Sequence, residues 1–348
     1  MDSAVPAHLR VERTEPARMR ADWNPPSPAF SPRLSPDVTG TVMGYYGIQY
    51  RGERPTAADL AHATLTEHIE AADGPAYHDT AVVRDAAGYT NEVSVLYWLD
   101  QDQFRRWELN HPSWTAAGRP PDGLGYFQEI ALPGASDFEM ITGGRRQEGV
   151  ATQSESISEP IAEHAYWGSM RDRLPSSQTS ALEPHGELAF DDDGDLVVVK
   201  PHDGMALIRS GQDWVDTEGE ARAWWLEKIQ PVLREGMDFL TAQGRPIGCY
   251  ANRLMQLSVD GQPIEKTYGH SWWHSLSELE DWSRSHQTHL KIFGSFGQFI
   301  KHFQGAAGLR LYHEVAVLDA NQLRFEYLRC HPETGLLGAR PNAHSSSS

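Results

Sequence analysis

The pattern of apolar and polar residues in the first part of the chain predicts strands and helices in a definite order. Residues 42–50 are rich in tyrosine, valine and isoleucine, which is typical of a strand. After residue 56, apolar residues recur at helical spacing at positions 60, 65 and 69. Later patterns predict strands at 77–83 and 92–98, a short helix at 103–109 and a strand at 125–132. The predicted order is strand, helix, strand, strand, helix, strand.

The same order recurs in the second half of the chain. A strand at 205–210 precedes a long helix at 218–241, whose apolar face comprises Leu226, Ile229, Leu233, Met237 and Leu240. Strands at 248–259 and 264–270 meet at Asp260-Gly261, a typical hairpin turn. Helices at 276–285 and 288–303 precede a strand at 309–318. Two β-α-β-β-α-β units predict an α+β fold of two ferredoxin-like units with antiparallel sheets, a pseudo-repeat of the dimeric α+β-barrel kind.

These elements divide the chain into five segments. Residues 1–40 are rich in proline and arginine and predict an irregular N-terminal arm. Residues 41–142 form the first expected unit, 143–202 a connecting segment and 203–335 the second unit. Residues 336–348, which end in a run of serines, predict a disordered tail.

Composition narrows the possible partners and the location. The 30 Lys and Arg against 48 Asp and Glu give a net charge of −18, which argues against binding to nucleic acid or to anionic membranes. Two cysteines cannot build a disulfide framework, and the sequence has no CxxC pair. The N-terminus lacks the apolar core of a signal peptide, and no apolar stretch approaches the ~20 residues that span a bilayer. We therefore expect a cytoplasmic protein.

Two histidines lie in apolar surroundings. In the helix predicted at 288–303, His289 shares a face with Phe293, Phe296 and Ile300. Such an imidazole can be the axial iron ligand beneath a flat hydrophobic cofactor, or a core histidine bonded to a carbonyl. Strand alternation places His313 on the face of apolar residues, where it is either a core residue or an acid–base group.

Three polar residues are less distinctive on their own. Ser210 ends a predicted strand and precedes Gly211, so its hydroxyl is either free to act or simply starts a turn. Arg173 and Glu139 have the pattern of surface charges. The chain has neither the GxxxxGK[ST] nor the GxGxxG nucleotide-binding pattern.

Four segments together carry more information than any single residue. They occur in the order 165–173, 206–214, 282–290 and 309–315. In combination they resemble the haem-containing aldoxime dehydratases, and the resemblance runs nearly from end to end of the chain. It implies that the two units enclose a pocket for b-type haem, with ferrous iron as the active form and no covalent attachment. The absence of CxxCH agrees with this.

The resemblance also implies a reaction and roles for single residues. The reaction converts R–CH=N–OH to R–C≡N and water, with the oxime nitrogen on the iron, in a homodimer. His289 matches the iron ligand, His313 the distal acid–base histidine and Ser210 the distal serine that orients the hydroxyl. Arg173, with Arg171 as its alternative, and Glu139 match the functional arginine and glutamate; Arg173 and Glu139 are expected to keep the distal histidine protonated. The candidate apolar wall for the R group comprises Ile141, Ile208 and Phe296.

Three other functions compete with this hypothesis. A haem peroxidase or dismutase-like oxidoreductase could use the same fold, as could a non-catalytic haem-binding protein. The third is a haem-free α+β barrel that binds a small apolar ligand.

Overall fold

The computed structural model describes residues 1–341. Its first strands are β1 (Pro32–Arg33), β2 (Val42–Arg51), β3 (Tyr77–Arg84), β4 (Tyr89–Trp98), β5 (Gly125–Ala131), β6 (Phe138–Thr142) and β7 (Ser156–Ile157). The later strands are β8 (Ala189–Asp193), β9 (Leu196–Lys200), β10 (Met205–Asp213), β11 (Cys249–Val259), β12 (Gln262–Trp273), β13 (Arg310–Leu318) and β14 (Leu323–Leu328). The helices are α1 (Thr56–Glu70), α2 (Gln101–Asn110), α3 (Ser169–Arg173), α4 (Gly219–Trp224), α5 (Gln230–Gln243), α6 (Leu276–Ser285) and α7 (Gln287–Phe303).

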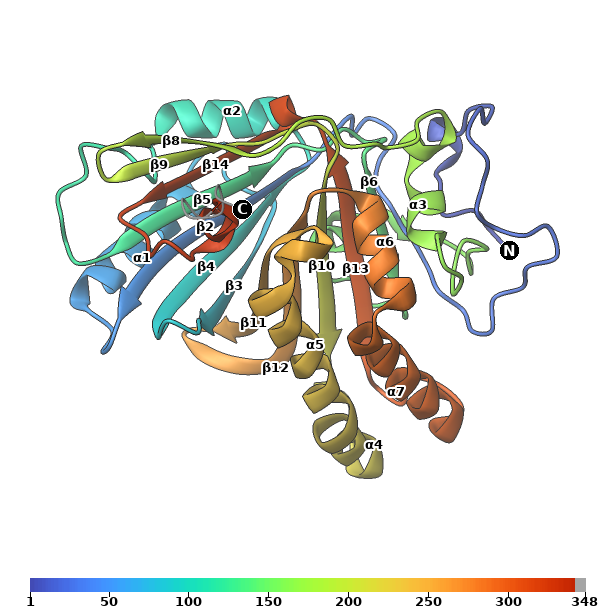
Figure 1. The fold of residues 1–348 in the computed structure, drawn as a ribbon. Helices are drawn as coiled ribbons and strands as arrows, with labels where there is room; N and C mark the ends of the chain where they lie inside the picture. The colour runs from blue at the N-terminus through green and yellow to red at the C-terminus, as the bar shows by residue number, and fades with distance from the viewer. Residues whose placement is uncertain (342–348) are drawn as a thin grey trace, which may run out of the picture.

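Twelve of the strands form one curled sheet of antiparallel pairs, in the order β6-β13-β10-β12-β11-β3-β4-β2-β5-β14-β9-β8 (Figure 1). The remaining two, β1 and β7, pair with each other. The expected α+β class with antiparallel sheets is thus confirmed. Strands of the first half are ordered β3-β4-β2-β5 and those of the second half β11-β12-β10-β13, with β11 paired to β3 between them.

The curled sheet buries a core between its two halves and carries helices outside. Residues from β2, β4 and β5 pack with residues from β10, β12 and β13 in one central apolar cluster. Helices α1 and α2 cover the outer face of the first half. Helices α5, α6 and α7 cover the outer face of the second half, where α5 packs against β11 and α6 against β10 and β12 (Figure 1). None of the helices within residues 1–341 is long and apolar enough to cross a membrane.

The long helix predicted at 218–241 is interrupted. A π-helical turn, Trp225–Ile229, separates α4 from α5. The extra residue in this turn rotates the helix face, so that Trp225 is buried while Leu226 is 38% exposed. The assignment of Leu226 to the buried face was therefore wrong, whereas Leu233, Met237 and Leu240 are buried as expected.

Strands β6, β8, β9 and β14 were not predicted. The segment expected only to connect the halves contains the β8–β9 hairpin, which extends the sheet beyond β14. The tail predicted to be disordered from residue 336 instead forms a 3₁₀ turn at Gly335–Ala339. Leu336 and Leu337 are buried there against the central cluster, which offsets the entropy of ordering the chain. The rest of that predicted tail, residues 342–348, lies outside the described residues.

Candidate active site

Three neighbouring strands bring the predicted polar residues onto one face of the sheet. Ser210 on β10 is the direct partner of His313 on β13, and His313 is the direct partner of Ile141 on β6. One row away, Ile208 and Glu139 flank the same face, because side chains two residues apart in a strand point the same way. This is the face that α6 and α7 cover in Figure 1.

Ser210 does not end its strand, contrary to the sequence prediction. Strand β10 continues to Asp213, and Ser210 pairs with Gly269 on one side and His313 on the other. Gly211 allows this continuation, because a Cβ there would lie 1.9 Å from Cε1 of Tyr312. The glycine leaves room for the tyrosine ring on the opposite face of the sheet and does not break the strand.

His289 faces the site from α7. Its ring lies 4.8 Å from that of Trp282 and 6.2 Å from that of Trp167. Its Nδ1 is buried, and a hydrogen bond between the ring and the backbone of Ser283 opposes the effect of burial on the pKa. Burial lowers the pKa of His289 to about 4, so the imidazole is neutral and can act as a metal ligand.

The surroundings of His289 fit a flat apolar group such as haem. Phe293, one helical turn away, is 51% exposed, and Trp167, whose ring lies 5.3 Å from it, is 42% exposed. Within residues 1–341, no three His, Cys, Asp or Glu side chains are grouped so that they could hold a metal ion. A single histidine ligand is sufficient for iron when a porphyrin ring supplies the other ligands.

Arg173 and Glu139 form a buried ion pair beside the His313 row. Arg173 Nη2 and Nε donate to the two carboxylate oxygens of Glu139 at 2.7 and 2.8 Å. Burial raises the pKa of Glu139, and the guanidinium opposes that shift. Arg171 points elsewhere, to Glu280 on α6 at 2.8 Å and to the hydroxyl of Ser277. Of the two candidate arginines, only Arg173 contacts a strand of the site.

The electrostatics at His313 differ from the expectation. Burial lowers the pKa of His313 to about 3, and the positive charge of Arg173 lowers it further, as do His289 and His164. The prediction that Arg173 and Glu139 keep His313 protonated is therefore wrong for the ligand-free protein. A nearby guanidinium disfavours the imidazolium, because two positive charges then share a buried site.

The sequence analysis missed His164, which lies close to Arg173 and His313. Burial and the charge of Arg173 lower the pKa of His164 to about 4. It belongs to an irregular segment whose backbone is held by the N-terminal arm, where Trp23 Nε1 donates to the carbonyl of His164 at 2.9 Å. Nothing in the periodicity of that segment pointed to it.

The three candidates for the apolar wall are in two different environments. Ile208 and Phe296 are partly buried against the cluster that packs α5, α6 and α7 on the sheet. Ile141 is 8% exposed and packs in a separate small cluster with Ala4, Ala29 and Ile161, mainly from the N-terminal arm. The arm thus covers the β6 side of the site.

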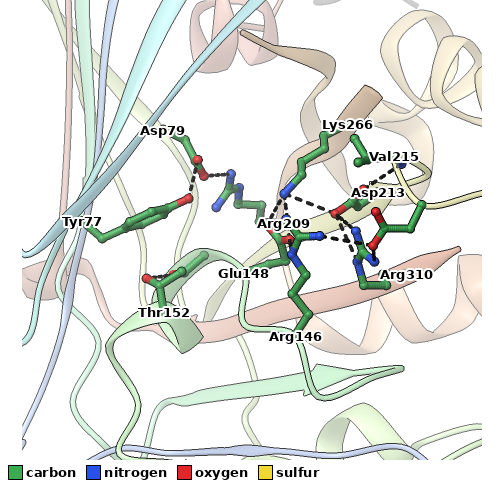
Figure 2. Close-up of polar contacts among 12 residues, drawn as sticks. Tyr77, Asp79, Arg146, Glu148, Thr152, Arg209, Asp213, Val215, Lys266 and Arg310 are labelled. Carbon is green, nitrogen blue, oxygen red and sulfur yellow. Dashed lines mark hydrogen bonds and ion pairs between the residues drawn. The ribbon is translucent and has the colours of Figure 1, made fainter. Parts of the chain in front are cut away.

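A cluster of charged residues fixes the end of β10 three residues beyond Ser210. Lys266 Nζ lies 2.7 Å from Glu148 Oε1 and 3.2 Å from Asp213 Oδ2. Arg310 Nη2 donates to the same Asp213 oxygen at 2.7 Å. Figure 2 shows Lys266 between the two carboxylates. These contacts tie β10 to β12 and β13 beside the site.

Comparison with known proteins agrees with this geometry. Residues 44–336 match the model of the haem-containing dehydratase family. An aliphatic aldoxime dehydratase of Pseudomonas chlororaphis is 44% identical, covering 97% of this chain and 98% of its own length. A phenylacetaldoxime dehydratase of Bacillus sp. is 27% identical over 92% of this chain and 93% of its own.

Solved structures show the same fold over nearly the whole chain. A crystal structure of aldoxime dehydratase superposes with a TM-score of 0.92 at 42% identity, covering 99% of this chain and 100% of that one. An aldoxime dehydratase in complex with butyraldoxime gives 0.92 at 41% identity, covering 97% and 96%. The resemblance inferred from the four sequence segments is confirmed, and the chain belongs to the haem-containing dehydratase family.

Proposed function

We propose that this protein is a lyase that dehydrates aldoximes to nitriles and water with haem as its cofactor. The observation that carries the proposal is the direct pairing of Ser210 with His313, whose pKa is lowered by the nearby His289 on α7. An aliphatic aldoxime is the proposed substrate, because the aliphatic enzyme is 44% identical and the phenylacetaldoxime enzyme 27%.

His289 would hold the iron of the haem, since its imidazole is neutral and lies near His313. When bound, b-type haem in the ferrous state would supply iron to which the oxime nitrogen can bind. Phe293 and Trp167 offer the exposed apolar surface that a porphyrin requires. Ile208 and Phe296 are the proposed wall around the R group, and Ile141 borders His313 on β6.

His313 is the proposed acid–base group. The reaction moves one proton from the aldehydic carbon to the leaving oxygen, so the group that carries it returns to its starting state. In the free protein His313 is neutral and can accept a proton, and the imidazolium so formed can protonate the leaving oxygen to give water. Ser210, its partner across the strands, hydrogen bonds the oxime oxygen and orients it.

Arg173 acts as a fixed positive charge beside His313. Glu139 holds it with two hydrogen bonds, so the guanidinium cannot turn away from the site. A positive charge there stabilises the negative charge that develops on the oxime oxygen as the N–O bond breaks. The same charge promotes proton release from the imidazolium.

We also infer the organisation around this site. The strand orders β3-β4-β2-β5 and β11-β12-β10-β13 support two ferredoxin-like units, proposed as residues 41–142 and 203–335 with the arm 1–40 and the segment 143–202 packed around them. Two cysteines that are free among the described residues support a cytoplasmic location. We propose a homodimer, which light scattering of the purified protein tests.

The experiment that tests the function uses purified, haem-supplemented protein. We expect a Soret band and, after anaerobic reduction with dithionite, conversion of butyraldoxime to butyronitrile measured by gas chromatography. Phenylacetaldoxime is the comparison substrate, and we expect slower conversion. Haem-loaded, reduced protein that leaves both oximes unchanged would contradict the proposal.

A further inference from the structure

Gln212 lies two residues beyond Ser210 on β10 and therefore on the same face of the sheet. Its side chain is buried in the described structure, with 5% of the residue exposed. Its Nε2 donates to the carbonyl of Ser210 at 2.7 Å and to the hydroxyl Oγ of Ser210 at 3.4 Å. The second contact is long and therefore weak, and it biases the hydroxyl proton of Ser210 away from Gln212 Nε2.

The orientation of the Gln212 amide is set from the neighbouring strand. Thr267 on β12 is the direct partner of Gln212, and its Oγ1 donates to Gln212 Oε1 at 2.8 Å. An amide oxygen only accepts hydrogen bonds, so this contact directs the NH₂ group of Gln212 toward Ser210. The next pair along the strands, Asp213 and Lys266, is joined by an ion pair (Figure 2) that ties β10 to β12 one residue beyond Gln212 and Thr267.

This chain of contacts determines what Ser210 can offer to a ligand. A serine hydroxyl has one proton and two acceptor positions, and Gln212 Nε2 occupies one of the acceptor positions. The hydroxyl proton is therefore directed away from Gln212. A second acceptor in place of the NH₂ group would attract that proton instead.

We propose that Gln212, held by Thr267, is a positioning residue that makes the Ser210 hydroxyl a donor to the oxime oxygen. The inference rests on the proposed aldoxime dehydration and specifies the direction of one hydrogen bond in it. The hydrogen bond from Ser210 strengthens as negative charge develops on the oxime oxygen during N–O cleavage. Gln212 therefore acts on the transition state through Ser210. Its loss lowers kcat more than it raises KM.

The test compares three substitutions in haem-loaded protein. In Gln212→Glu the new carboxylate accepts a hydrogen bond from the Ser210 hydroxyl, which then no longer donates to the substrate. We expect kcat to fall at least tenfold, with KM changed less than threefold. Thr267→Val removes the donor that orients the amide and lowers kcat several-fold, whereas Thr267→Ser keeps the donor and the activity. Gln103→Glu on α2 is the matched control, because Gln103 Nε2 donates to the carbonyl of Gly74 at 3.0 Å away from this face of the sheet, and it leaves kcat unchanged.

Two measurements separate positioning from a structural effect. In a Ser210→Ala background, Gln212→Glu should cause no further loss of kcat, because the residue through which it acts is missing. In the ferrous carbonyl complex, a Ser210 donor lowers the C–O stretching frequency, so Gln212→Glu should shift it toward that of Ser210→Ala. An unchanged frequency in Gln212→Glu, or an equal loss of kcat in both backgrounds, would overturn the inference. The infrared measurement needs no turnover, so it tests the Gln212–Ser210 contact even if the protein makes no nitrile.

Discussion

Ser210 and His313 are 103 positions apart in the sequence but directly opposite each other on adjacent antiparallel strands. Directly opposed side chains in such a pair have Cβ atoms only about 4.5–5.5 Å apart, so a small ligand can reach both. Behind them, on the other face of the sheet, Arg209 and Glu314 form the next pair in the register and are both fully buried. The relative position of the two site residues is therefore set by the register of the sheet and not by a flexible loop.

The two site histidines should have separable functions. His289→Ala removes the proposed iron ligand, and we expect the purified protein to lose its Soret band. His313→Ala keeps the haem but loses the acid–base group, which typically contributes ~10²–10⁴-fold to a rate. Haem content per protein and nitrile formation measure the two effects. An active His313→Ala protein would contradict the acid–base assignment.

The buried ion pair makes Glu139 important for stability. Glu139→Gln leaves the Arg173 guanidinium buried without its carboxylate, and we expect the free energy of unfolding to fall by about 3 kcal/mol. Urea denaturation measures the change. Glu280→Gln, which breaks the more exposed pair with Arg171, is the control and should cost less. Equal losses in the two variants would show that burial of the Arg173 pair has no special effect.

Two glycines should respond to alanine in opposite ways. Gly211→Ala places a methyl group 1.9 Å from the Tyr312 ring, so we expect a loss of about 1–3 kcal/mol in the free energy of unfolding. Gly294 lies inside α7 with open space around its Cβ position among the described residues. Gly294→Ala should therefore stabilise the helix by about 0.5–1 kcal/mol. Thermal unfolding of the two variants checks both signs.

The stability of the fold should decrease in mild acid because of His270. Burial lowers the pKa of His270 from 6.5 to about 3, and its ring lies 4.1 Å from that of Tyr45. Between these pH values the unfolded chain binds a proton that the folded protein does not, so stability falls as the pH decreases from 6.5 toward 3. At pH 5, this linkage should lower the free energy of unfolding by about 2 kcal/mol relative to neutral pH.

The variant His270→Phe keeps an aromatic ring beside Tyr45 but cannot take up a proton. Urea denaturation at pH 7.5 and pH 5 should show a smaller loss of stability in this variant than in the wild type. His8→Gln changes an exposed histidine and should leave the pH dependence as it is. A variant that loses as much stability as the wild type would show that His270 does not titrate in this way.

Periodicity predicted the elements whose residues alternate between core and solvent. The helices α6 and α7 and the hairpin of β11 and β12 begin and end close to the predicted residues, because their apolar spacing and the Asp260-Gly261 turn are local signals. The π-helical turn at Trp225 was not predictable in this way, since one inserted residue changes the face of a helix without changing its composition. Likewise, β6 is only five residues long and gave too short a pattern.

The sequence by itself determined the residue types of the site and, through four segments in register, the family. Only the tertiary structure decided which of them meet. Pairing of β6 with β13 places Glu139 and Ile141, from the first half of the chain, beside His313 from the second. The same packing gives Arg173 and Arg171 different carboxylate partners and lowers the pKa of His313, so that its ring is neutral. It also turns the amide of Gln212 toward Ser210. Register, burial and hydrogen-bond direction depend on contacts between residues distant in sequence, and local sequence patterns do not predict such contacts.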